Sequence, residues 1–279
     1  MRIDAHQHVW RLARGDYGWL TPELAPIYRD FSIDDLRPHL VAAGIDGTIL
    51  VQAAPTEAET EFLLGAAGES VGVAKGVVGW IDFEARDAPR RLERLARNPL
   101  LRGVRPMMQD IPDTDWMLNA LFEPAFRAVV DLGLCFDALV QPRHLGNLRR
   151  LLDRYPGLKL VVDHAAKPRI GAGEREPWAA DMRAIAGETA AWCKLSGLVT
   201  EAGAAWTATD LRPYTDHLLD CFGADRLIWG SDWPVVERAG GYDRWWTATA
   251  ALLRSLDAAS RERVLGGNAA RFYGIAEFP

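Results

Sequence analysis

Cysteine is scarce in this sequence of 279 residues, which holds 3 cysteines, Cys135, Cys193 and Cys221. Their number is odd and no Cys-x-x-Cys pair occurs, which argues against a disulfide framework. Two of them lie in apolar, strand-like segments, where buried free thiols are common. We therefore expect reduced thiols and a cytoplasmic protein.

Other missing features exclude further classes of protein. No run of about 18 apolar residues occurs, so no membrane span is expected. The first residues show no basic segment followed by an apolar one, so we expect no secretion signal. The formal net charge is −6 without a basic stripe, which argues against a nucleic-acid partner. No Gly-x-Gly-x-x-Gly motif follows the first predicted strand, so we expect no nucleotide or organic cofactor. A small-molecule substrate remains, and a homo-oligomer stays open.

What the sequence does contain is a regular alternation of apolar, strand-like segments with helical ones. Ser32 is predicted to cap a helix that ends at Gly44, and the alternation continues from there. About eight strands, each followed by a helical segment, imply parallel strands joined by right-handed crossovers. No linker or repeat divides the sequence. We therefore predict an α/β fold with one domain over residues 1–279, a single distorted (β/α)8 TIM barrel.

The expected elements cover most of the chain. Strands are predicted near residues 2–5, 48–52, 73–81, 101–105, 134–140, 158–163, 191–196 and 226–230. Helices are predicted near residues 33–41, 57–68, 88–97, 116–132, 143–154, 178–190, 211–222, 243–256 and 259–273. The irregular segment 9–31 is rich in aromatic residues, proline and glycine, and we expect it near the mouth of the barrel. The alternative is that its rings only seal one end of the core.

The first predicted strand leads into two histidines, His6 and His8, with one residue between them. Alternate residues of an extended chain point to the same side, so both imidazoles face one space. Two neutral imidazoles suit a divalent cation, or one ligand and one proton carrier. The alternative is a mobile N-terminus that happens to carry two histidines. The position directly after an apolar strand favours the functional interpretation.

Polar residues also follow most of the other predicted strands. In barrels of this kind, the chemistry takes place at the C-terminal ends of the strands. His164 alone is compatible with a satisfied core histidine, and Asp232 alone with a helix N-cap, because Pro234 follows it. Together with the first two histidines, they form the ligand and base set of a hydrolase barrel. The residues at the strand ends are His6, His8, Gln52, Trp80, Asp82, Arg105, Asp163, His164, Ser196, Ser231, Asp232 and Trp233.

The remaining histidines are expected outside this set. His39 and His217 lie within predicted helices and are expected to be exposed to solvent. His144 opens the helix after the fifth predicted strand and is expected at the rim of the barrel.

Three of these motifs together resemble the amidohydrolase superfamily. They are His6-x-His8 after the first strand, VDHAAKP at residues 162–168 and IWGSDWP at residues 228–234. GVVGWID at residues 76–82 and YGWL at residues 17–20 are similar to the branch of sugar-acid lactonases. That branch includes fuconolactonase and rhamnonolactonase, and it is related to the pyrone-dicarboxylate lactonases. The resemblance spans nearly the whole chain.

The sequence departs from the binuclear members of this superfamily, which carry a bridging carbamylated lysine on strand four and a histidine on strand five. None of its lysines ends the fourth predicted strand, and the fifth runs into Gln141 and Pro142. We therefore expect one divalent cation at most, zinc foremost, bound by His6, His8 and Asp232. A reaction without metal stays open. The lysines are Lys75, Lys159, Lys167 and Lys194.

The resemblance implies hydrolysis of a sugar-acid lactone of the L-fuconolactone or L-rhamnonolactone type. Asp232 is expected to be the base that deprotonates water and then returns the proton to the ring oxygen. His164, with Arg105 or a bound cation, is expected to stabilise the oxyanion, and His6 and His8 complete the catalytic set. One alternative is a metal-dependent decarboxylase of an aromatic or enoic acid, and another is a barrel that only binds. Substrate contacts are expected from Trp19, Gln52, Trp80, Asp82, Arg105, Lys167 and Trp233.

Overall fold

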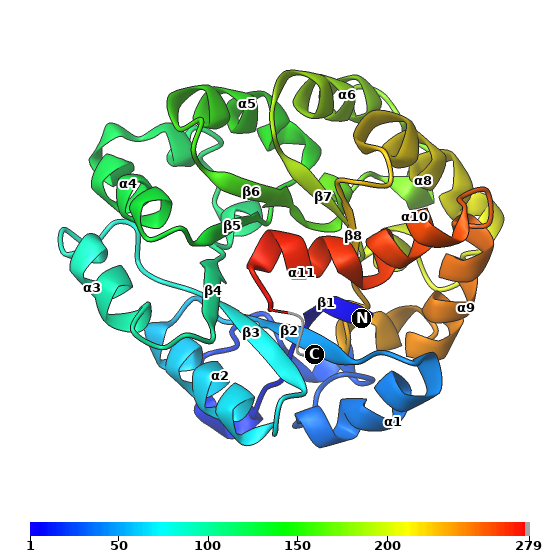
Figure 1. Cartoon of the computed structure of the whole chain (residues 1–279), viewed down its shortest axis with the longest axis horizontal. Helices are drawn as coiled ribbons and strands as arrows, with labels where there is room; N and C mark the ends of the chain where they lie inside the picture. The colour runs from blue at the N-terminus through cyan, green and yellow to red at the C-terminus, as the bar shows by residue number, and fades with distance from the viewer. Residues whose placement is uncertain (277–279) are drawn as a thin grey trace.

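The computed structural model of this protein describes residues 1–276, and eight strands in it form one parallel sheet in sequence order (Figure 1). Backbone hydrogen bonds join β1 to the segment after β8: the His8 N–H donates to the Trp233 carbonyl at 2.7 Å, and the Asp232 N–H donates to the His6 carbonyl at 2.8 Å. The predicted (β/α)8 barrel is thus confirmed. The strands are β1 Ile3–Gln7, β2 Gly47–Val51, β3 Ala74–Gly79, β4 Leu101–Val104, β5 Cys135–Ala138, β6 Lys159–Val162, β7 Trp192–Leu195 and β8 Leu227–Trp229.

Helices surround the strands on the outside of the barrel (Figure 1). The predicted cap of the first helix is confirmed, because the Ser32 side chain accepts from the Asp35 N–H and Gly44 ends the helix in the left-handed conformation. Among the described residues, no helix is long and apolar enough to cross a membrane. The α-helices are α1 Ile33–Ala43, α2 Glu57–Glu69, α3 Ala88–Leu95, α4 Glu123–Asp131, α5 Leu145–Arg154, α6 Trp178–Glu188, α7 Leu198–Ala202, α8 Ala208–Phe222, α9 Tyr242–Leu252, α10 Ala258–Glu262 and α11 Asn268–Tyr273.

Two predicted helices are interrupted. Residues 116–132 begin with two 3-10 turns, Trp116–Leu118 and Ala120–Phe122, because Asn119 is extended and its side chain accepts from the Leu121 N–H. Residues 259–273 are divided by a π turn at Arg263–Gly267. The remaining 3-10 turns are Leu12–Arg14, Pro22–Leu24, Met108–Asp110, Pro142–His144, Asp163–Ala166, Ile170–Ala172 and Val235–Ala239.

The last helix, α11, crosses one end of the barrel (Figure 1). Gly266, just before it, passes so close to the start of β1 that a Cβ there would lie 2.4 Å from the Met1 carbonyl oxygen. Phe272 and Tyr273 of α11 pack in one apolar cluster with barrel residues such as Ile3 and Ile228. This packing covers the N-terminal ends of the strands, so the opposite end is left for a site.

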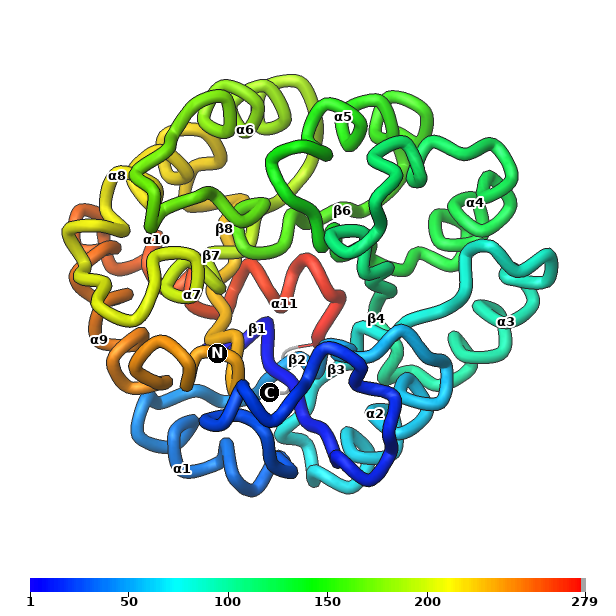
Figure 2. The backbone as a smooth tube through the Cα atoms, turned by 180° about the vertical axis from the view of Figure 1, so that it is seen from behind, coloured from blue at the N-terminus to red at the C-terminus, as the bar shows by residue number. Residues whose placement is uncertain are grey.

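The aromatic segment 9–31 lies at that opposite end, over β1 to β3 (Figure 2). Trp10 is fully buried and pairs with Phe31 through two backbone hydrogen bonds of 3.0 Å. The Trp19 indole N–H donates to the Ala53 carbonyl, just after β2, at 2.7 Å. The segment therefore stands beside the mouth of the barrel, as predicted, and its rings also extend the core.

Candidate active site at the C-terminal ends of the strands

Three histidines converge on the carboxylate of Asp232. The Nε2 atoms of His8, His6 and His164 lie 3.3, 3.8 and 3.9 Å from Asp232 Oδ1, respectively. All four residues are buried, with at most 5% of their surface exposed. His6 and His8 face the same space, with ring centroids 5.0 Å apart, as the extended spacing predicted. The structure therefore brings the four predicted catalytic residues together, although β1, β6 and β8 supply them from distant parts of the chain.

A strained backbone brings His164 and Asp232 to this place. Residues 164–167 all have positive φ angles, of 51°, 51°, 59° and 54°, and Asp232 has φ 60°. Such angles are unfavourable for residues other than glycine and are concentrated at functional sites. The turn at 164–167 brings the His164 Nδ1 atom to 2.9 Å from Ser196 Oγ. Gly197 must be glycine here, because a Cβ would lie 2.5 Å from His164 Nδ1.

Burial sets the protonation of this cluster. It lowers the pKa of His164 to about 4 and, together with the nearby Lys194 charge, lowers the pKa of His6 well below its ordinary value. Both imidazoles are therefore neutral near pH 7. Burial also disfavours the ionised form of Asp232, but the interactions with His164 and His8 outweigh this effect and hold its pKa far below the usual range. The cluster thus combines neutral imidazoles with a carboxylate.

His8 is oriented by the strand beside it. Its Nδ1 atom lies 2.7 Å from the Val51 carbonyl oxygen, at the end of β2. A carbonyl only accepts hydrogen bonds, so His8 carries a proton on Nδ1, and its Nε2 atom faces Asp232. Such a second partner is typical of histidines that bind a metal ion.

Arg105 and Gln52 are bound to each other below the histidines. The Arg105 Nε atom donates to Gln52 Oε1 at 3.1 Å, and its Nη2 atom donates to the Gln52 carbonyl. Its Nη1 atom lies 3.3 Å from Asp163 Oδ2. Gln52 is fully buried and Arg105 is 3% exposed. In this arrangement they hold the histidines and are as buried as them, and their contact with substrate stays a prediction.

Trp233, also predicted to contact substrate, is buried next to Asp232. It is 2% exposed and packs edge-on against Phe31, with ring centroids 5.1 Å apart. Its indole thus fills the space under the aromatic segment, and its contact with substrate stays a prediction. Like Gln52, it can be exposed only if neighbouring residues move.

The other predicted substrate residues line two separate cavities. Trp19, Trp80 and Asp82 border a cavity of about 530 Å³. Lys167 borders another of about 850 Å³, whose wall also includes Glu201, and the two residues pair at 3.7 Å. Trp116, which we had not selected from the sequence, lies in the wall of the first cavity. Asp110 borders both.

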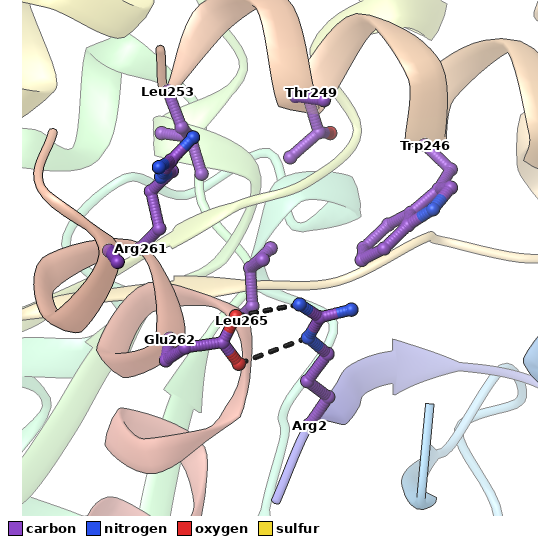
Figure 3. Close-up of a pocket in the computed structure, with 9 residues that line it drawn as sticks. Arg2, Trp246, Thr249, Leu253, Arg261, Glu262 and Leu265 are labelled. Carbon is purple, nitrogen blue, oxygen red and sulfur yellow. Dashed lines mark hydrogen bonds and ion pairs between the residues drawn. The ribbon is translucent and has the colours of Figure 1, made fainter. Parts of the chain in front are cut away.

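A third cavity, of about 380 Å³, lies away from the histidines (Figure 3). It is lined by Arg2, which precedes β1, and by residues of α9 and α10, including Trp246 of α9. The Arg2 guanidinium forms two hydrogen bonds with the Glu262 carboxylate, of 3.0 and 2.6 Å (Figure 3). None of the predicted site residues lines this cavity.

Two charged residues in the interior of the barrel were missed at the sequence level. Lys194 of β7 and Asp137 of β5 are both fully buried, and the Lys194 ammonium lies 3.0 Å from His6 Nδ1. The signal was a charge within an apolar strand, but we had considered the lysines only as bridging ligands on strand four. The prediction for His217 was wrong: it is 3% exposed, and its Nε2 atom donates to the Ala179 carbonyl at 2.8 Å. His39 is partly exposed, and His144 is buried.

Comparison with known proteins identifies the family. A family model described as amidohydrolase matches residues 3–275. The L-fucono-1,5-lactonase of Burkholderia ambifaria is 46% identical over 278 residues, which cover 98% of this chain and 96% of that protein. The chain belongs to the amidohydrolase family. The L-fucono-1,5-lactonase of Burkholderia multivorans is 37% identical, covering 99% of this chain and 97% of that protein.

A solved amidohydrolase shows the same fold. The crystal structure of an amidohydrolase from Burkholderia multivorans with bound zinc has 36% identity and a TM-score of 0.90 to this chain, covering 99% of this chain and all of that one. This agreement over the full length confirms the amidohydrolase resemblance inferred from the strand-end motifs.

The donor set of this amidohydrolase fits a divalent cation. One nitrogen each from His6 and His8 and one oxygen of Asp232 all lie within 4.8 Å of one another. A second grouping, His6, Asp163 and His164, shares His6 with the first. Neutral imidazoles and a carboxylate are ligands that zinc and similar ions prefer. His6, His8 and Asp232 can therefore hold a divalent cation.

Proposed function

We propose that this amidohydrolase opens the ring of sugar-acid lactones, with L-fuconolactone as the first candidate. The observation that carries the proposal is the ionised carboxylate of Asp232, which meets three imidazoles at the mouth of the barrel. Two curated relatives named L-fucono-1,5-lactonase, 46% and 37% identical over nearly the full length, support this substrate class.

The four clustered residues have distinct proposed roles. Asp232 takes a proton from water as the water oxygen attacks the lactone carbonyl carbon. His164, held by Ser196 at 2.9 Å, lies where it can stabilise the charge on the carbonyl oxygen. When the bond to the ring oxygen breaks, Asp232 returns the proton to that oxygen, and the product is a hydroxy acid. A divalent cation, for which zinc is our candidate, would polarise the carbonyl or the water when bound by His6, His8 and Asp232.

The two cavities at the mouth suggest how the sugar is bound. Trp19 and Trp80 offer flat apolar faces for the C–H side of a sugar ring, and Asp82 can accept hydrogen bonds from hydroxyl groups. On the other side, the Lys167 ammonium is available for the carboxylate formed by hydrolysis, close to its partner Glu201. Arg143 and Arg169 also border this cavity, but carboxylates outnumber the cations there, which suits a neutral lactone better than a dicarboxylate.

A panel of substrates tests the proposal. We expect L-fucono- and L-rhamnonolactones to be hydrolysed, with one proton released per turnover and detected by a pH indicator. Pyrone dicarboxylates and aromatic acids are the comparison compounds. Decarboxylation of an aromatic or enoic acid, with all sugar lactones inert, would favour the decarboxylase alternative and refute the lactonase.

A further inference from the structure

The two histidines of β1 have opposite hydrogen-bonding surroundings. His8 lies between two acceptors, the Val51 carbonyl at Nδ1 and the Asp232 carboxylate at Nε2. His6 lies between two donors, the Lys194 ammonium at 3.0 Å from Nδ1 and the Arg105 guanidinium at 3.3 Å from Nε2. A neutral imidazole has one donor and one acceptor, so His6 can accept from only one of the two.

Lys194 is the stronger donor to His6. Its ammonium is fully buried and also bonds Asp137 Oδ2 at 2.5 Å and pairs with Asp163 Oδ1 at 3.0 Å. An ammonium has three N–H donors and no acceptor, so it can donate to His6 Nδ1 as well as to both carboxylates. Arg105 lies farther from His6, at 3.3 Å, and its guanidinium also donates to Gln52 and pairs with Asp163. His6 Nδ1 is therefore the acceptor.

Tyr273 of α11, at the end of the barrel that α11 covers, fixes the Lys194 ammonium through Asp137. The Tyr273 hydroxyl of α11 donates to Asp137 Oδ2 at 2.8 Å, and Asp137 in turn binds Lys194. A polar chain thus leads through the barrel from α11 to His6. Its members are fully buried or nearly so, which limits the positions that Lys194 can adopt.

We propose that Lys194 is a positioning residue that fixes the tautomer of His6. With Nδ1 accepting from Lys194, the ring proton of His6 lies on Nε2, the atom that faces Asp232. A nitrogen that carries a proton cannot bind a metal ion, so His6 is the weakest of the three expected cation ligands. To bind a cation through Nε2, His6 must move its proton to Nδ1, where Asp163 Oδ1 at 3.5 Å is the available acceptor. Lys194 thereby lowers the affinity of the site for divalent cations.

The tautomer can be measured directly by ¹⁵N NMR on the metal-stripped, full-length protein. His6 is expected to carry its proton on Nε2 and His8 on Nδ1, with the His6 signals assigned from a His6→Asn variant. Lys194→Met removes the donor and should move the His6 proton to Nδ1. Lys194→Gln keeps an N–H donor without the charge and should retain the Nε2 proton. A wild-type His6 that already carries its proton on Nδ1 would overturn the proposal without any variant.

Zinc titration of the same proteins gives a second readout. Lys194→Met should bind zinc at least about tenfold more tightly than the wild type, because the competing donor and a nearby positive charge are both removed. Lys159→Met, at an exposed position at the start of β6, is the matched control and should bind zinc like the wild type. If Lys194→Met does not fold, Lys194→Met with Asp137→Asn removes the ion pair as a unit. A zinc affinity within twofold of the wild type refutes the proposal.

The proposal rests on the cation site of the proposed lactonase, but neither readout involves a lactone. Failure of every sugar lactone to react would refute the proposed function and leave the His6 tautomer as measured. An unchanged tautomer in Lys194→Met would refute the role of Lys194 and leave lactone hydrolysis untouched.

Discussion

At the N-terminal ends of the strands, the interior of the barrel is filled by apolar side chains, whereas at the C-terminal ends it is filled by ionisable ones. Ile3 and Ile49 belong to the first layer and pack with Phe272 of α11. His6 and Asp232 belong to the second and are just as buried. Burial of apolar groups stabilises a fold, but burial of charged groups costs free energy unless they are paired. The first layer therefore supplies stability, and the second uses part of it to hold reactive groups in place.

The backbone differs between the two ends as well. Near α11, the unusual contact is at Gly266, where absence of a side chain permits close packing against β1. At the mouth, residues 164–167 and Asp232 adopt left-handed angles although none of them is glycine. Strain of this kind persists only where surrounding structure enforces it. A change at the closed end should consequently alter stability, and a change at the mouth should alter activity.

The largest expected effect is at the mouth. Asp232→Asn removes the base while keeping the size of the side chain, so kcat/KM for the lactone should fall about 1000-fold. The variant should still fold, with a lower temperature of unfolding, because asparagine keeps the shape but loses the interactions that favour the ionised carboxylate. Steady-state kinetics and thermal unfolding of the same sample measure both. Near-normal turnover would show that another residue is the base.

The corresponding change at the closed end is Gly266→Ala. The added Cβ would lie 2.4 Å from the Met1 carbonyl oxygen and 2.5 Å from Arg2 Cα, and backbone atoms cannot move aside easily. We expect a loss of about 2–3 kcal/mol in the free energy of unfolding, with the KM of the folded enzyme unchanged. Gly146→Ala is the control, because a Cβ there meets no atom within 4 Å. Equal stability of the two variants would contradict the close contact.

Glu59 offers a test of buried charge that depends on pH. Burial raises its pKa from 4.5 to about 7, although the N–H groups of Ala53 and Ala54 oppose the shift. Between about pH 4.5 and pH 7, Glu59 keeps its proton in the folded protein but has lost it in the unfolded chain. The stability that this proton contributes is fully present below about pH 4.5 and is lost as the pH rises towards 7. We expect the free energy of unfolding to fall by about 2 kcal/mol between pH 5 and 8. Denaturant unfolding should show a weaker pH dependence in Glu59→Gln, and an unchanged one would refute this assignment.

The smallest effect is expected at the ion pair in the third cavity. Arg2 and Glu262 are 36% and 51% exposed in their side chains, so water and salt screen their interaction. Glu262→Gln should lower the free energy of unfolding by less than about 1 kcal/mol and leave kcat/KM unchanged. The difference should shrink further in 1 M salt. A clear loss of activity would show that the two ends of the barrel are coupled.

Most of the fold and the centre of the site follow from the sequence. Apolar segments of four to nine residues between helical patterns predicted parallel strands, and parallel strands end at one edge. The sequence therefore predicts that His6, His8, His164 and Asp232 lie together. The sequence pattern did not predict the break at Asn119 in the helix expected over residues 116–132. The Asn119 side chain accepts a hydrogen bond from the Leu121 N–H, and this local bond competes with the helix although the apolar pattern continues.

The sequence alone determined which residues lie at the C-terminal ends of the strands. Side chains alternate between the two faces of a strand, and parallel strands all end at the same side of the barrel, so few other arrangements are possible. Only the tertiary structure decided what each of them faces. Lys194 lies 188 positions from His6, and nothing local indicates that its ammonium reaches Nδ1. Likewise, nothing local indicates that the Arg105 guanidinium binds Gln52 and reaches His6. The register and tilt of the strands set these directions, and they arise from the closure of the whole barrel, which no single segment encodes.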